Sequence, residues 1–152
     1  MRVLVIGSGG REQAIAWACR HHGHDVRVDA DLGDASAADT DLVIPGPEAA
    51  RVAGVADEWA RRGIPCFGPT ADLARLESSK SFARELATSL GIPGPAFGRF
   101  DDAEAAIAWW NDLARPVVVK LDGLAAGKGV TVPSNDAETV AAIAAASGVG
   151  PF

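Results

Sequence analysis

Lysines and glycines are concentrated in one segment, Pro116–Val130, where they could bind the phosphates of a nucleotide. A β-branched run ends at Lys120, and a glycine-rich loop surrounds Lys128 before a strand-like segment resumes at Val130. Glycine lets the backbone approach an anion closely, and two ammonium groups supply compact positive charge. Two of the chain's three lysines lie here. The segment therefore predicts a phosphate-covering hairpin, and a glycine-rich hairpin with two surface lysines is the simpler alternative.

A second glycine-rich turn, Gly7–Arg11, follows a short apolar run and precedes a predicted helix. A helix N-terminus presents free N–H groups, and Arg11 could add a bidentate contact, so the turn predicts a bound phosphate or small anionic substrate. A purely structural turn is one alternative. Dinucleotide binding is another: its fingerprint fails at Glu12, but Asp29 lies 22 residues after Gly7, near the position of a ribose-binding acid.

Two further motifs place a charged side chain at the start of a predicted helix. Glu48, in Gly46-Pro47-Glu48, could bind ribose hydroxyls or an amine, or could only favour its helix through the dipole. Lys80 lies where a cation is mildly disfavoured, so a partner anion would explain it. A surface lysine is an equally good explanation.

Composition excludes several classes of protein. The chain has 152 residues, of which 48% are hydrophobic and 22% charged, so it can form one ordinary domain or two small ones. Its net charge of −6 argues against a general nucleic-acid or membrane-surface binder. No apolar run approaches the roughly 20 residues of a membrane span. With two widely separated cysteines, we expect a cytoplasmic chain with free thiols.

The hydrophobic pattern divides the chain at the prolines near residues 69 and 96. Strands and helices alternate in residues 1–69, which predicts a doubly wound parallel sheet with its ligands at the carboxyl ends of the strands. Residues 70–96 predict two helices and a proline-containing linker. Residues 97–147 predict a small α+β unit in the order strand, helix, strand, strand, helix, with the first strand before Asp101. Predicted strands cover 2–6, 26–28, 42–44 and 64–67, and predicted helices cover 11–22, 49–62, 70–77, 79–90, 101–113 and 135–146. The last two helices are each preceded by a predicted capping pair, Asp101 with Glu104 and Asn135 with Glu138.

Across nearly the whole chain, the motifs resemble in order and context the phosphoribosylamine–glycine ligase family of the ATP-grasp superfamily. The matching segments are Arg2–Glu12, Gly46–Ala49, Gly63–Thr70, Leu76–Lys80 and Pro116–Val130. The resemblance implies a Rossmann-like pre-ATP-grasp domain in residues 1–69, a helical linker in 70–96 and a partial ATP-grasp subdomain in 97–152. It also implies a carbon–nitrogen ligase of purine biosynthesis, in which ATP phosphorylates glycine and the amine of phosphoribosylamine attacks the glycyl phosphate.

The resemblance also implies two sets of binding residues. Those implied for ATP are Lys80, Lys120, Asp122, Gly123, Gly127, Lys128 and Gly129. Those implied for the phosphoribosylamine side are Gly7, Gly9, Gly10, Arg11, Gly46, Pro47 and Glu48. No catalytic residue and no metal ligand is assigned within the chain, because the family's ligands for the Mg²⁺ that accompanies ATP lie beyond residue 152.

The chain departs from the family pattern at Gln13, Ser79 and Leu121, and in a shortened acidic segment, Asp29–Asp41. The resemblance also covers only the N-terminal part of the family. We therefore expect a fragment or divergent homologue that is inactive alone. One alternative is a non-catalytic nucleotide- or phosphosugar-binding protein, or a subunit whose partner chain supplies the missing C-terminal half. A dinucleotide-binding protein is the other.

Overall fold

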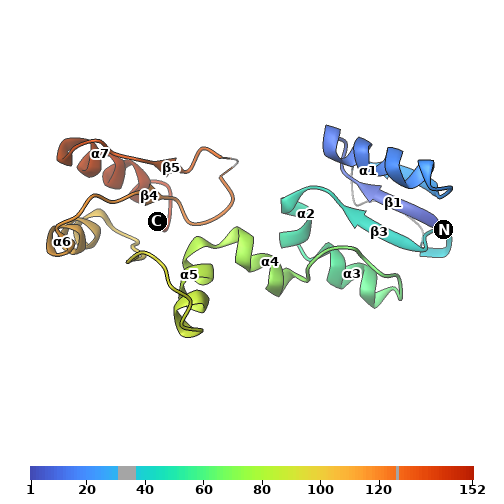
Figure 1. The fold of residues 1–152 in the computed structure, drawn as a ribbon, viewed down its shortest axis with the longest axis horizontal. Coiled ribbons are helices and arrows are strands. Elements are labelled where there is room, and N and C mark those ends of the chain that lie inside the picture. The colour runs from blue at the N-terminus through green and yellow to red at the C-terminus, as the bar shows by residue number, and fades with distance from the viewer. Residues whose placement is uncertain (31–36, 126) are drawn as a thin grey trace. The chain divides into compact units, whose positions relative to one another are not determined.

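The computed structural model describes residues 1–30, 37–125 and 127–152, and it divides into two compact units, Met1–Arg75 and Leu76–Phe152 (Figure 1). Within the shortened acidic segment, Asp31 and Asp34 lie outside the described residues. A 3₁₀ turn, η1 (Ala37–Asp39), follows them. The predicted division at residues 69 and 96 stays a prediction. In the described part of the chain, no helix combines the length and apolar character that crossing a membrane would require.

The first unit is built on a three-stranded parallel sheet. Its strands β1 (Arg2–Ile6), β2 (Asp25–Asp29) and β3 (Leu42–Pro45) lie in the order β2-β1-β3. Alternate residues of a strand point to opposite faces, so an apolar run can bury both faces of a parallel sheet. The predicted doubly wound parallel sheet is therefore confirmed in its strands, and its two cores show how both faces are covered.

Each face of this sheet has its own apolar core. Val3 and Val5 pack with Ala16 of α1 (Gly10–His21) on one face. On the other face, Leu4 and Ile6 pack against α2 (Glu48–Val52) and α3 (Val55–Arg61), where Trp59 is the largest fully buried side chain. The turns after β1 and β3 are thereby fixed at the same edge of the sheet, the edge where ligands of such folds bind.

Two predictions about the first unit are wrong in detail. The strand predicted for 64–67 is only a single bridge between Val43 and Cys66. Pro65 has no N–H to donate, and this limits regular pairing there. The single helix predicted for 49–62 is two helices, because Gly54 between them takes the left-handed conformation with φ +84°.

The second unit contains the predicted hairpin. The helix α4 (Ala71–Ser78) leads into this unit, and α5 (Lys80–Ser89), α6 (Ala103–Leu113) and α7 (Asp136–Ser147) lie within it. Strands β4 (Val119–Lys120) and β5 (Val130–Thr131) pair antiparallel, which confirms the hairpin around the lysines. The core of the unit joins β4 to the two longest helices through Val119, Ala106 and Ile143.

Two predictions about the second unit are also wrong in detail. No strand forms over 97–100, where only Phe100 pairs its N–H and C=O with Phe152, at 2.9 and 3.0 Å. The cap of α6 is Asp102, whose Oδ1 accepts from Ala105 N at 2.9 Å. Asp101, the predicted cap, instead pairs with Arg99.

The predicted cap of the last helix is confirmed. Asn135 Oδ1 accepts from Glu138 N at 2.9 Å, and the Glu138 carboxylate accepts from Asn135 Nδ2 and from Ser134 N.

Candidate functional site

In the first unit, one buried carboxylate, that of Glu12, fills the space between the two glycine turns. Glu12 is only 4% exposed, and its Oε2 accepts a hydrogen bond from Gly9 N at 2.8 Å. A Cβ added at Gly7 would lie 2.8 Å from Glu12 Cγ, and one at Gly9 would lie 2.7 Å from Glu12 Oε2. A Cβ at Gly46 would also collide with this side chain. The Glu12 side chain therefore fits only because the three neighbouring residues are glycines without a Cβ.

Arg11 links Glu12 to the second turn. Its Nε donates to Glu12 Oε1 at 3.2 Å, and its Nη1 lies 3.4 Å from Glu48 Oε1. The Arg11 hydrogen bond is the main reason that the pKa of Glu12 is lowered from 4.5; burial opposes this shift and the Gly9 N–H adds to it. The result is a buried carboxylate, held ionised, beneath a half-exposed cation and a second carboxylate.

The structure brings together the residues predicted to bind the phosphoribosylamine side. Gly46 N donates to Ile6 O at 2.9 Å, so the second turn lies beside the end of β1. A Cβ at Gly7 would lie 2.9 Å from Pro47 Cδ, whereas the space beside Gly10 is open. Sequence reasoning missed Glu12 as a member of this cluster. Its position was the available signal, because Glu12 stands where the dinucleotide fingerprint requires a small residue.

Glu12 also changes the chemistry expected of this turn. The Gly9 N–H, which could bind an external anion at the start of α1, already donates to Glu12. A pyrophosphate lying along the turn would meet this carboxylate. The positive charge available to a ligand here is the guanidinium of Arg11, and Glu48 next to it can accept from an amine or a hydroxyl.

In the second unit, main-chain hydrogen bonds close the base of the lysine loop. Leu121 N donates to Gly129 O at 2.8 Å, and Lys128 N donates to Ala125 O at 2.8 Å. Gly123 and Gly127 have φ of +114° and +79°, values that side chains other than glycine rarely adopt. Lys128 is exposed on this loop.

Asp122 connects this loop to the start of α5. Its Oδ1 accepts from Lys80 N at 2.6 Å and from Ser81 N at 3.3 Å, and its Oδ2 accepts from the hydroxyls of Ser79 and Ser81. Burial tends to raise the pKa of Asp122, but these hydrogen bonds together lower it below 3.8. The Asp122 carboxylate thus binds the main chain at Lys80, and a partner anion for the Lys80 ammonium stays a prediction. The Lys80 ammonium donates to Gly123 O at 2.7 Å.

One cavity of about 690 Å³ in this unit brings together three of the predicted nucleotide-binding residues, Lys80, Lys120 and Asp122. Aromatic side chains form much of its apolar wall: Phe97, Phe100, Trp109, Trp110 and Phe152. The cavity thus combines cations with an apolar surface, as a nucleotide requires for its phosphates and its base. The loop residues Gly123, Gly127, Lys128 and Gly129 are not among those that line it.

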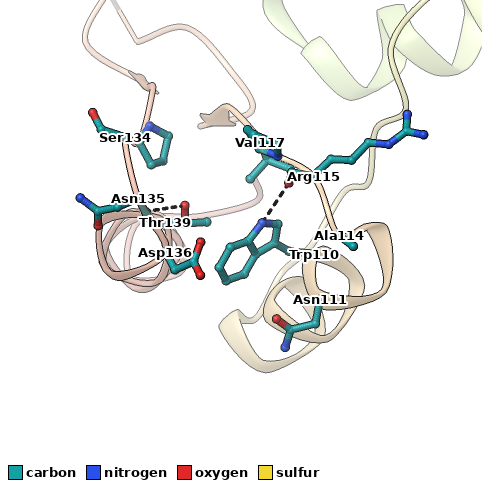
Figure 2. A pocket seen from close by; sticks show the side chains of 11 residues that line it. Trp110, Asn111, Ala114, Arg115, Val117, Ser134, Asn135, Asp136 and Thr139 are labelled. Carbon is teal, nitrogen blue, oxygen red and sulfur yellow. Dashed lines mark hydrogen bonds between the residues drawn. The ribbon is translucent and has the colours of Figure 1, made fainter.

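A smaller cavity of about 380 Å³ lies between α6 and the start of α7 (Figure 2). Trp110 Nε1 donates to Arg115 O at 3.1 Å on one side, and Thr139 Oγ1 donates to Asn135 O at 3.0 Å on the other. None of the predicted binding residues lines this cavity. Trp110 and Thr139 thus bind main-chain carbonyls of the cavity wall itself, and we assign the cavity no ligand.

Comparison with known proteins places the whole chain beside one group of enzymes. Residues 24–77 match the family model "Phosphoribosylglycinamide synthetase, N domain", and residues 78–148 match "Phosphoribosylglycinamide synthetase, ATP-grasp (A) domain". The phosphoribosylamine–glycine ligase of Pseudomonas aeruginosa is 40% identical over 167 aligned positions, which cover 94% of this chain and 39% of that protein. The one from Allochromatium vinosum is 39% identical and covers all of this chain and 41% of that protein. The chain thus spans about two-fifths of the length of these relatives.

Solved structures agree with the sequence comparison. The crystal structure of phosphoribosylamine–glycine ligase from Thermotoga maritima aligns over 99% of this chain and 42% of its own, with a TM-score of 0.73 and 28% identity. An ADP complex of N5-carboxyaminoimidazole ribonucleotide synthetase gives a TM-score of 0.79 at 17% identity, over 99% of this chain and 45% of its own. At that identity the likeness concerns the fold alone.

Proposed function

Because the chain belongs to the phosphoribosylglycinamide synthetase family, we propose that it acts as the N-terminal part of an ATP-dependent ligase that joins glycine to phosphoribosylamine. The observation that supports this most is the shared cavity of Lys80 and Lys120, which lie 40 residues apart in the sequence and on different elements. The glycine loop that follows Lys120 fits a lid over the phosphates. A cytoplasmic location is part of the proposal, since ATP and glycine are cytoplasmic metabolites.

In this mechanism the chain's residues position charge rather than form covalent bonds. Transfer of the γ-phosphoryl group from ATP to the glycine carboxylate gives glycyl phosphate and ADP. The amine of phosphoribosylamine then attacks the acyl carbon and displaces phosphate. Lys80 and Lys120 would neutralise the phosphates during the first step, with the Gly127-Lys128-Gly129 segment above them. Arg11 would hold the sugar phosphate, and Glu48 would accept from a ribose hydroxyl or the amine.

Magnesium is expected with ATP in this family, but the residues at hand do not supply its site. Within residues 1–30, 37–125 and 127–152, no group of three or more His, Cys, Asp or Glu side chains could hold a metal ion. The Asp122 carboxylate is also occupied by hydrogen bonds to the start of α5. We therefore assign no step to a metal held by this chain.

The proposal is tested by ADP release with Mg-ATP, glycine and freshly generated phosphoribosylamine, omitting each substrate in turn. A fluorescent ATP analogue measures nucleotide binding in parallel. ADP release that requires both other substrates would show the ligase reaction in this chain. Binding without release is the result expected of a chain that acts as the N-terminal part of the enzyme and is inactive alone, and a nucleotide-binding protein or subunit would give the same result. A folded chain that binds no nucleotide would contradict both.

A substitution within the cavity identifies the binding site. Lys120→Ala should weaken binding of the ATP analogue by about tenfold or more, because the substitution removes a cation that faces the phosphates. The matched control is Arg61→Ala, which removes an exposed cation in the last turn of α3. Equal effects of the two substitutions would place the nucleotide somewhere other than this cavity.

A further inference from the structure

Asp122 has no free position to offer a nucleotide. Lys80 N, Ser81 N and the hydroxyls of Ser79 and Ser81 occupy both of its carboxylate oxygens, and its side chain is 14% exposed. Its main-chain N–H donates to Pro151 O at 2.8 Å. Asp122 is therefore fixed both through its backbone and through its side chain. This suits a residue that holds other residues in place, and not one that binds the nucleotide itself.

The bonds made by Asp122 determine where the Lys80 side chain can reach. The carboxylate binds the main chain of Lys80 at 2.6 Å, and the next residue, Gly123, accepts from the Lys80 ammonium at 2.7 Å. Two contacts between the same two segments thus form a closed ring. The Asp122 carboxylate lies at the N-terminal end of the ten-residue helix α5, where negative charge is stabilising. Without the Asp122 carboxylate, the main chain at Lys80 would no longer be fixed next to the loop that the ammonium binds.

We propose that Asp122 is a positioning residue, which holds the Lys80 ammonium at the glycine-rich loop so that it meets the phosphates of ATP. The ATP part of this inference rests on the function proposed above. Gly123 O accepts from the Lys80 ammonium, and a phosphate oxygen takes over this role when ATP binds. Asp122 keeps its bonds to α5 throughout and does not touch the nucleotide.

Competitive acylation of lysine amines tests the positioning role without any nucleotide. The chain has only three lysines, so a limiting acetylating reagent and peptide mass spectrometry give a separate rate for each. Asp122→Ala should raise the rate at Lys80 by about fivefold or more, because an amine held by a hydrogen bond to a fixed carbonyl reacts slowly. Lys120 and Lys128 should stay within about twofold of their rates in the unmodified sequence.

Two further variants separate positioning from a general loss of structure. Asp122→Asn keeps an acceptor oxygen for Lys80 N, so it should raise the Lys80 rate by less than Asp122→Ala does. Asp102→Ala removes a carboxylate that caps a different helix of the same unit and should leave Lys80 unchanged. An unchanged Lys80 rate in Asp122→Ala, or an equal increase at all three lysines, would overturn the proposal.

A nucleotide arm distinguishes this inference from the proposed function. Mg-ATP should slow acylation of Lys80 in the unmodified chain. If it gives no such protection, the proposed function is contradicted. The acylation rates without nucleotide still decide the role of Asp122. In a double-mutant cycle, Asp122→Ala should weaken ATP binding in the normal background and have little further effect in Lys80→Met. Full additivity of the two changes would mean that Asp122 does not act through Lys80.

Discussion

At the scale of single residues, the buried carboxylate of Glu12 explains why three glycines surround it. Glycines in such a turn usually make room for a bound anion next to the backbone. Here the carboxylate of Glu12 occupies that space. The Glu12 side chain binds Arg11, whose guanidinium also lies next to Glu48. Under the proposed function, the turn would accept a ligand with a single phosphate and a hydrogen-bond donor more readily than a pyrophosphate.

Glu12 also makes the stability of the first unit sensitive to acid. Its pKa is lowered from 4.5 in the folded chain, mainly by the Arg11 hydrogen bond, so its stabilising effect is full above about pH 4.5 and is lost as the pH falls. Glu12→Gln removes this titration and weakens the bonds to Gly9 and Arg11. The urea midpoint of Glu12→Gln should therefore lie below that of the unmodified chain near pH 7, and the difference between the two midpoints should be smaller at about pH 3.

A matched control for this titration is Glu104→Gln, which changes an exposed glutamate in the first turn of α6. It should shift the urea midpoint little at either pH. A difference between Glu12→Gln and the unmodified chain that stays constant down to about pH 3 would mean that the Glu12 charge does not contribute through this linkage.

At the scale of elements, Gly54 divides one predicted helix into two. Its φ of +84° is costly for any residue with a Cβ, although space is available, since the nearest atoms to an added Cβ lie at 3.5 and 3.6 Å. Gly54→Ala should therefore lower the free energy of unfolding by about 1 kcal/mol through backbone strain. Gly148→Ala is the control, because Gly148 ends α7 with φ −76°. Chemical denaturation measures both, and equal effects would contradict the strain argument.

The cap of α6 offers a second test at this scale, between adjacent aspartates. Asp102 accepts from the N–H of Ala105, whereas Asp101 makes an exposed ion pair with Arg99. Asp102→Ala should cost about 1 kcal/mol of unfolding free energy, and Asp101→Ala should cost less than about 0.5 kcal/mol. The reverse order in urea denaturation would show that the helix begins one residue earlier than described.

These elements show which parts of the fold the sequence could predict. Apolar runs such as Arg2–Ile6 and capping pairs such as Asn135 with Glu138 are local patterns, and they gave the right strand and the right helix start. The break at Gly54 depends on a backbone angle that several glycines in the sequence could have adopted. The strand predicted for 64–67 failed because pairing depends on partners that a local pattern does not contain.

The candidate sites show the same limit. Gly7, Arg11, Lys80 and Lys120 could be chosen from residue type and context, because glycine turns and isolated lysines are typical of phosphate sites. The contact of Asp122 with the start of α5 joins residues 41 to 43 positions apart, and no spacing rule indicates it. Glu12 was visible as an exception to a fingerprint, but its burial among three glycines follows only from the folded turns.

At the scale of the whole molecule, an acidic chain has to bind anions through a few local cations. The net charge of −6 would repel ATP and sugar phosphates at long range, so under the proposed function their affinity would depend on Arg11 in the first unit and on the three lysines in the second. Each unit carries one of these groups of cations. The proposed function therefore predicts that the two ligands are bound by different units.

Hydrogen exchange can map this division in the unmodified chain, with ribose 5-phosphate and Mg-ATP added separately. Ribose 5-phosphate should protect amides near residues 9–12 and 48–50, and Mg-ATP should protect amides near residues 80–82 and 119–130. Arg11→Ala should abolish only the first pattern, and Lys128→Ala should weaken only the second, so each substitution is the control for the other. Protection of the Gly7–Arg11 turn by Mg-ATP would instead favour nucleotide binding in the first unit, as in a dinucleotide-binding protein, because that turn would then be contacting the nucleotide.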